Sequence, residues 1–102
     1  MRQPENDAPT RGIAILGSTG SIGTQALEVV RDQRDALHVE VLSAHSNADL
    51  LVAQALEFKP NAVVIGDEAK WKQVNDALFD EGIKVYSGAE ALEQVVEVDG
   101  ID

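Results

Sequence analysis

Three glycines spaced three residues apart, Gly17, Gly20 and Gly23, mark the stretch of this sequence that is best suited to bind a phosphate group. Glycine has no Cβ, so its backbone can turn tightly and approach a ligand closely. The residues between these glycines include three with hydroxyl groups, Ser18, Thr19 and Ser21. The G-x-x-G-x-x-G spacing differs from the G-x-G-x-x-G dinucleotide fingerprint. A connecting turn without a ligand is therefore the alternative interpretation.

The predicted elements on either side of these glycines favour the phosphate site. Residues 13–16 are apolar and partly β-branched, which is typical of a buried strand in a parallel sheet. A helix is expected to begin near Ser21, because apolar residues then recur at helical spacing, namely Ile22, Ala26, Val29 and Val30. Such a helix directs its free backbone N–H groups and the positive end of its dipole toward the turn. Strand, glycine turn and helix together indicate phosphate or nucleotide binding.

Composition limits the classes of function. The 102 residues suffice for one small domain, and the formal net charge of −10 makes nucleic acid an unexpected partner. The chain has no cysteine and no apolar run approaching the roughly 18 residues of a membrane helix, so we expect no disulfide and no membrane insertion. Residues 1–11, which include Pro4 and Pro9, are expected to form a disordered tail.

The rest of the chain repeats the alternation of strand and helix. Strands are expected at residues 39–44, 62–65 and 83–86, each followed by an amphipathic segment. Asn47 or Ser46 is suited to cap the second helix, and Trp71 is expected to serve in packing and not as a base-stacking platform. The last helix is expected to begin with the S-x-x-E pattern at Ser87 and to turn three glutamates, Glu90, Glu93 and Glu97, toward solvent.

This alternation predicts a Rossmann-like, doubly wound parallel sheet. We expect the strand order 3-2-1-4, in which the first strand is central and its glycine turn lies at the topological switch point. The acidic end of the sequence, residues 98–102, is expected to form a turn that leads into another strand. We therefore expect the domain to be truncated at its carboxyl end.

Two motifs then carry a family resemblance. Residues 17–23, G-S-T-G-S-I-G, and residues 44–47, A-H-S-N, resemble the 1-deoxy-D-xylulose 5-phosphate reductoisomerase family. The resemblance implies that residues 12–102 are the amino-terminal portion of an NADPH-binding domain. It further implies a full-length cytoplasmic homodimer of non-mevalonate isoprenoid biosynthesis, which isomerises and reduces 1-deoxy-D-xylulose 5-phosphate to 2-C-methyl-D-erythritol 4-phosphate with NADPH and Mg²⁺ or Mn²⁺.

Carried over by position, the resemblance implies two groups of cofactor-binding residues. The first, expected at the cofactor phosphates and ribose, comprises Thr19, Gly20, Ser21 and Ile22. The second, expected around the adenosine ribose 2′-phosphate, comprises His45, Ser46 and Asn47. Family members often have Gly-Lys before this asparagine, whereas the present sequence has His45-Ser46 and no lysine in the turn.

No residue of this chain is expected to be catalytic or to bind the metal, because the family's metal-binding acids and catalytic loop would lie beyond residue 102. His38 is expected to be a surface or edge residue, and the chain alone is predicted to be inactive. The alternative hypothesis is a stand-alone α/β module that binds a nucleotide or phosphate and regulates without catalysis.

Overall fold

The computed structural model describes residues 10–88, in which strands and helices alternate. The strands are β1 (Arg11–Ile15), β2 (Leu37–Ala44), β3 (Ala62–Ile65) and β4 (Lys84–Ser87). The helices are α1 (Ser21–Asp32), α2 (Ala48–Phe58) and α3 (Trp71–Leu78), with short 3₁₀ turns η2 (Glu68–Lys70) and η3 (Phe79–Glu81) on either side of α3. Most of the expected tail and the helix expected after Ser87, with its three glutamates, lie outside the described residues.

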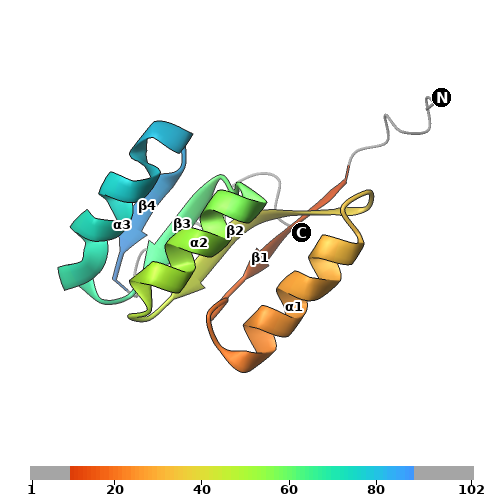
Figure 1. Ribbon diagram of the computed structural model, residues 1–102, viewed down its shortest axis with the longest axis horizontal. Coiled ribbons are helices and arrows are strands. Elements are labelled where there is room, and N and C mark those ends of the chain that lie inside the picture. The colour runs from red at the N-terminus through yellow and green to blue at the C-terminus, as the bar shows by residue number, and fades with distance from the viewer. Residues whose placement is uncertain (1–9, 89–102) are drawn as a thin grey trace.

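All four strands are parallel and lie in the order β1-β2-β3-β4 (Figure 1). The predicted order 3-2-1-4 is therefore wrong: β4 pairs with β3, with Val63 opposite Val85, and β1 lies at one edge of the described sheet. With right-handed crossovers, a return to β1 would need α3 on the opposite face of the sheet from α2. Val74 and Leu78 of α3 instead join the same core as α2, so the chain continues outward past β3.

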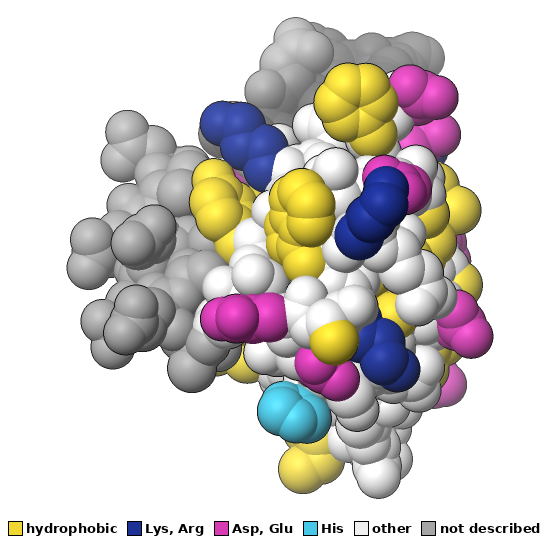
Figure 2. Space-filling view, turned by 90° about the vertical axis from the view of Figure 1, so that its left-hand side faces the viewer, with side chains coloured by type: hydrophobic (Ala, Val, Ile, Leu, Met, Phe, Trp, Pro, Cys, Tyr) yellow, Lys and Arg dark blue, Asp and Glu magenta, His cyan; other side chains and the backbone are white. Residues whose placement is uncertain are grey.

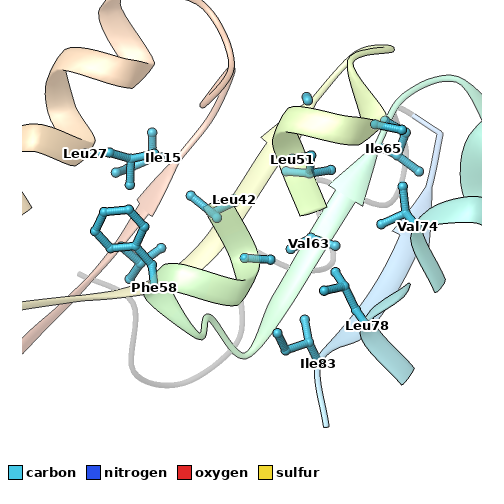
Figure 3. Close-up of a cluster of buried hydrophobic side chains, with 14 of the residues drawn as sticks. Ile15, Leu27, Leu42, Leu51, Phe58, Val63, Ile65, Val74, Leu78 and Ile83 are labelled. Atoms are coloured by element: carbon cyan, nitrogen blue, oxygen red, sulfur yellow. The ribbon is translucent and has the colours of Figure 1, made fainter. Parts of the chain in front are cut away.

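The main core lies between the sheet and the three helices, which cover one face (Figures 1 and 3). Figure 3 shows Leu51 and Phe58 of α2 between the strands and the neighbouring helices. The side chains at its centre, each almost inaccessible to solvent, are Leu42, Leu51, Val63, Ile65, Val74 and Leu78. A smaller cluster of Val41, Ala62 and Val64 is buried on the other face of the sheet.

Helix α1 faces the core with only part of its predicted apolar stripe: Val30 is buried and Ala26 packs against the core, as expected, but Ile22 and Val29 do not. Its buried residues are Gly23, Leu27 and Val30, whereas Ile22 is 81% exposed and Val29 is 54% exposed. The reason lies in the glycine turn: a Cβ built on Gly23 would stand 2.2 Å from the carbonyl oxygen of Gly17. Only glycine fits against the turn there, so this face points inward and Ile22 points out.

A polar network lies toward the amino ends of β2 and β3, away from the glycine turn. The ring of His38 contacts the hydroxyl of Thr10 and the carboxylate of Glu40, and the amide of Asn61 donates to the same carboxylate. Glu40 is the extra residue where the register between β1 and β2 shifts, and it is only 7% exposed. His38 is half-buried near the amino end of β2, which lies between β1 and β3, and its ring helps to satisfy this carboxylate.

The α3–β4 side carries mixed side chains. Figure 2 shows separate hydrophobic groups among acidic and basic ones on this face. The indole Nε1 of Trp71 donates to the carbonyl oxygen of Val85 at 2.8 Å, so this side chain ties α3 to β4, in keeping with a packing role. None of the helices within residues 10–88 is long and apolar enough to cross a membrane.

Candidate functional site

The turn between β1 and α1 exposes backbone at the start of a helix. Gly17 has φ +72°, a conformation that favours glycine, and its carbonyl oxygen accepts a hydrogen bond from the N–H of Gly20 at 3.1 Å. Gly20 is the N-cap of α1 and supplies no side chain to cap it. The first turn of α1 therefore presents N–H groups and a positive dipole end to any anion bound there.

Ser18 anchors this turn from the inside. Its side chain is fully buried, and its Oγ donates to Gln54 Oε1 of α2 at 2.7 Å while Gln54 Nε2 donates to the carbonyl oxygen of Ser18 at 2.9 Å. Ser43 of β2 adds two bonds, accepting from Gly17 N at its Oγ and from Ser18 N at its carbonyl oxygen. Ser18 is thus a positioning residue whose hydroxyl is already used.

Sequence reasoning missed Gln54 and Ser43. The one indication for Gln54 was a polar residue on the helix face that carries Leu51 and Phe58, where an apolar residue is usual. Because both groups of Gln54 are paired with Ser18, its burial is compensated. The structure therefore makes the shape of the glycine turn dependent on α2.

The first predicted group of cofactor residues lies on the outer side of the turn. Gly20, Ser21 and Ile22 line one hollow together with the end of β1, and all three are exposed. Thr19 is half-buried and does not line this hollow. Because α1 turns Gly23 toward the glycine turn, Ile22 faces outward and is available to contact a ligand.

The second predicted group is divided between two hollows at the carboxyl ends of the strands. Because the strands are parallel, the turns after β1, β2 and β3 share this edge of the sheet (Figure 1). His45 lines a hollow with Gly17, Ser43 and Gly66, beside the glycine turn. Its lining is mainly apolar apart from Ser43 and His45, which suits a flat ring such as a purine.

Ser46 and Asn47 line a separate hollow at the amino end of α2. Asn47 is the N-cap, as predicted: its Oδ1 accepts from the N–H of Leu50 at 3.2 Å. The same hollow is lined by Asp49, Lys70 and Gln73, and Nζ of Lys70 donates to the carbonyl oxygen of Ser46 at 3.2 Å. Sequence reasoning missed Lys70, which comes from the turn after β3.

Together these features have the geometry to receive a nucleotide with more than one phosphate. The glycine turn and the start of α1 suit one phosphate group, and the start of α2 suits another. Residues 43–47, at the end of β2, contain no carboxylate that would hold ribose hydroxyls and repel a 2′-phosphate. Within residues 10–88, no three His, Asp or Glu side chains lie together in a way that could hold a metal ion.

Comparison with known proteins places this chain in a family. A family model described as 1-deoxy-D-xylulose 5-phosphate reductoisomerase matches residues 13–102. The chain belongs to this family. It is 56% identical over 90 residues to the 1-deoxy-D-xylulose 5-phosphate reductoisomerase of Phocaeicola vulgatus, covering 88% of this chain and 24% of that relative. For the Bacteroides fragilis reductoisomerase the identity is 52% over 97 residues, covering 95% of this chain and 25% of that relative.

Solved reductoisomerase structures share the fold. The Zymomonas mobilis reductoisomerase in complex with NADPH matches with a TM-score of 0.83 and 27% identity, over 89% of this chain and 24% of that one. A reductoisomerase in complex with NADPH, fosmidomycin and magnesium matches with a TM-score of 0.84 and 29% identity, over 90% and 23%. The Rossmann-like fold and the family predicted from the sequence are thus confirmed. The chain spans about a quarter of the length of these reductoisomerases.

Proposed function

We propose that this chain is the NADPH-binding part of a 1-deoxy-D-xylulose 5-phosphate reductoisomerase. The whole protein would isomerise and reduce 1-deoxy-D-xylulose 5-phosphate to 2-C-methyl-D-erythritol 4-phosphate. The proposal rests on the glycine turn, in a chain that belongs to this family. This turn is held in place by Ser18, Ser43 and Gln54, and it lies beside the turn after β2, which contains no carboxylate. The cytoplasm as location and a homodimer as full-length assembly belong to the same proposal.

Within this proposal, the described residues bind and orient the cofactor. Gly20, Ser21 and Ile22, with Thr19 next to them, would contact its phosphates and ribose through backbone N–H groups, a hydroxyl and an apolar surface. The hollow lined by His45 would receive the adenosine, and the start of α2 at Ser46 and Asn47 would receive the 2′-phosphate. Bound NADPH supplies the hydride for the reduction.

No residue of this chain is assigned to catalysis or to the metal. Mg²⁺ or Mn²⁺, and the residues that bind it and the sugar phosphate, would belong to parts of the protein outside this chain. We therefore expect the chain alone to show no substrate-dependent oxidation of NADPH. A stand-alone regulatory module is the less favoured alternative, because the relatives that match are reductoisomerases.

Substitution of Gly20 tests the proposed binding site. A Cβ at Gly20 would meet the carbonyl oxygen of Gly17 at 3.5 Å, an ordinary contact, and its φ of −82° suits any residue. Gly20→Val should therefore fold yet place a branched side chain where the phosphates must approach. Titration of cofactor fluorescence should give tight NADPH binding by the parent and by Ala77→Val, a control on exposed α3 surface, and at least about tenfold weaker binding by Gly20→Val. Equal affinities in all three would refute the proposal.

A further inference from the structure

The side chain of Lys70 reaches the turn after β2, which has no cationic residue of its own. Residues 44–49 contain no lysine or arginine, yet Nζ of Lys70 donates to the carbonyl oxygen of Ser46 at 3.2 Å. We propose that Lys70 recognises the ribose 2′-phosphate of the cofactor and so selects NADPH over NADH. This inference rests on the proposed function and adds to it a residue that determines cofactor specificity.

The turn after β3 holds Lys70 in this position through a series of backbone hydrogen bonds. Gly66 N donates to the carbonyl oxygen of Ala44 at 2.8 Å, and Asp67 N donates to that of His45 at 2.7 Å. Lys70 N then donates to the carbonyl oxygen of Asp67 at 2.9 Å, which closes η2. These bonds fix the two turns to each other. They also place the side chain of Lys70 next to the amino end of α2.

The groups around the hollow suit a phosphate. Ser46 offers a hydroxyl, and α2 directs its positive dipole end and its first N–H groups to the same place. An ammonium group has three N–H donors. One of those of Lys70 is used on Ser46, which leaves two for phosphate oxygens.

The neighbouring charges leave this role to Lys70. Asp49, the acid that lines the hollow, accepts a hydrogen bond from Gln73 Nε2 at 2.7 Å, which holds its carboxylate toward α3. Lys72, the next lysine along the chain, pairs with Asp76 on the exposed side of α3 at 3.0 Å. Since the chain carries a net charge of −10, a phosphate needs such a local cation to be bound at the start of α2.

The test compares two substitutions of equal charge change. Lys70→Gln and the control Lys72→Gln are titrated with NADPH and with NADH by cofactor fluorescence, and the thermal midpoint of each variant is recorded. Lys70→Gln should raise the Kd for NADPH about tenfold or more and leave that for NADH unchanged, because only NADPH carries the 2′-phosphate. Lys72→Gln should change neither Kd, and Lys70→Arg should retain most of the preference.

The outcomes separate this inference from the proposed function. If the parent binds neither cofactor, the proposed function fails and the inference fails with it. If the parent prefers NADPH and Lys70→Gln keeps that preference, the inference alone is overturned. An equal loss of both cofactors in Lys70→Gln would also overturn it, because it would show that Lys70 merely supports the two turns.

Discussion

Ser18 and Gln54 exchange two hydrogen bonds across the boundary between the glycine turn and α2, with the hydroxyl donating at 2.7 Å and the amide donating at 2.9 Å. Both residues are buried, so neither can turn to water instead. The turn that would receive the cofactor phosphates therefore owes its shape to a helix that lies far from it in sequence.

Replacement of Gln54 by Leu should loosen this turn. Leu keeps the volume but leaves the hydroxyl and carbonyl oxygen of Ser18 without partners, at a cost of about 1–3 kcal/mol in the free energy of unfolding. NADPH binding should weaken as well, since the turn would lose its support. Urea unfolding and cofactor titration measure the two effects, with Gln25→Leu on the exposed side of α1 as control. Unchanged stability in Gln54→Leu would contradict the assigned role.

Gly23→Ala should be more harmful than Gly20→Ala. At Gly23 a Cβ would meet backbone atoms of the turn, 2.2 Å from Gly17 O and 2.6 Å from Ser18 Cα, so the turn must move. At Gly20 the nearest contact is an ordinary 3.5 Å. We expect Gly23→Ala to lose about 1–3 kcal/mol of stability, as in other overpacked sites, and to lose affinity for NADPH. Similar stabilities of the two variants in urea would show that the turn yields easily.

An acid at position 46 should reverse the cofactor preference. A carboxylate in Ser46→Asp would stand at the start of α2, where it repels a 2′-phosphate and can hold ribose hydroxyls. The variant should bind NADPH at least about tenfold more weakly than the parent does, which corresponds to about 1.4 kcal/mol of binding free energy. It should bind NADH as tightly as the parent does, or more tightly. Ser46→Asn, of similar size without the charge, serves as control. A constant ratio of the two Kd values would exclude this turn as the 2′-phosphate site.

Acid should weaken the link between α1 and α2. The pKa of Glu57 is lowered, first by the hydrogen bonds from Arg31 and also by the charges of Arg31 and Arg34. Because the pKa is lower in the folded state, the ionised Glu57 stabilises the fold at neutral pH. This stabilisation is lost as the pH falls from about 4.3, the ordinary glutamate pKa, through the lower pKa of the folded state. The effect should be small, because all three side chains are well exposed.

Comparison of the parent with Glu57→Gln in urea checks this sign. The variant should be slightly less stable at pH 7, and the difference should shrink on titration to pH 3 and also in high salt. A difference that grows toward acid pH would contradict the role of Glu57. Both guanidinium groups also lie over the ring of Phe58, at 5.2 Å and 4.9 Å, so their packing should persist in the variant.

Local patterns in the sequence predicted the elements of this domain well. The start of α1 at Ser21 and the Asn47 cap depend on neighbouring residues, and the structure has them where expected. The first strand is present but shifted, at Arg11–Ile15 instead of residues 13–16, and Leu16 is exposed after its end. The predicted core face of α1 was right for Ala26 and Val30 but wrong for Ile22 and Val29, because hydrophobicity alone cannot show that Gly23 must lie against the turn. The periodicity of an amphipathic helix fixes its buried face only when apolar side chains decide the packing.

Relationships between distant residues were the part that the sequence could not supply. Both strand orders obey the same crossover rule, and the choice depends on which face of the sheet Val74 and Leu78 of α3 cover. Lys70 shows the same limitation at the candidate site. Nothing in its local sequence links it to Ser46, because the link is made by the pairing of β2 with β3 and by the turns that follow.

The ring of His45 rests against the backbone of Gly66, where an added Cβ would stand 2.9 Å from Nδ1. The side chains at positions 45 and 66 would therefore compete for the same space, although the two positions belong to different turns. In the course of evolution, a larger residue at position 66 should be accepted only together with a smaller one at position 45. Covariation of this pair among relatives would show how the hollow lined by His45 has changed shape while the two turns stayed joined.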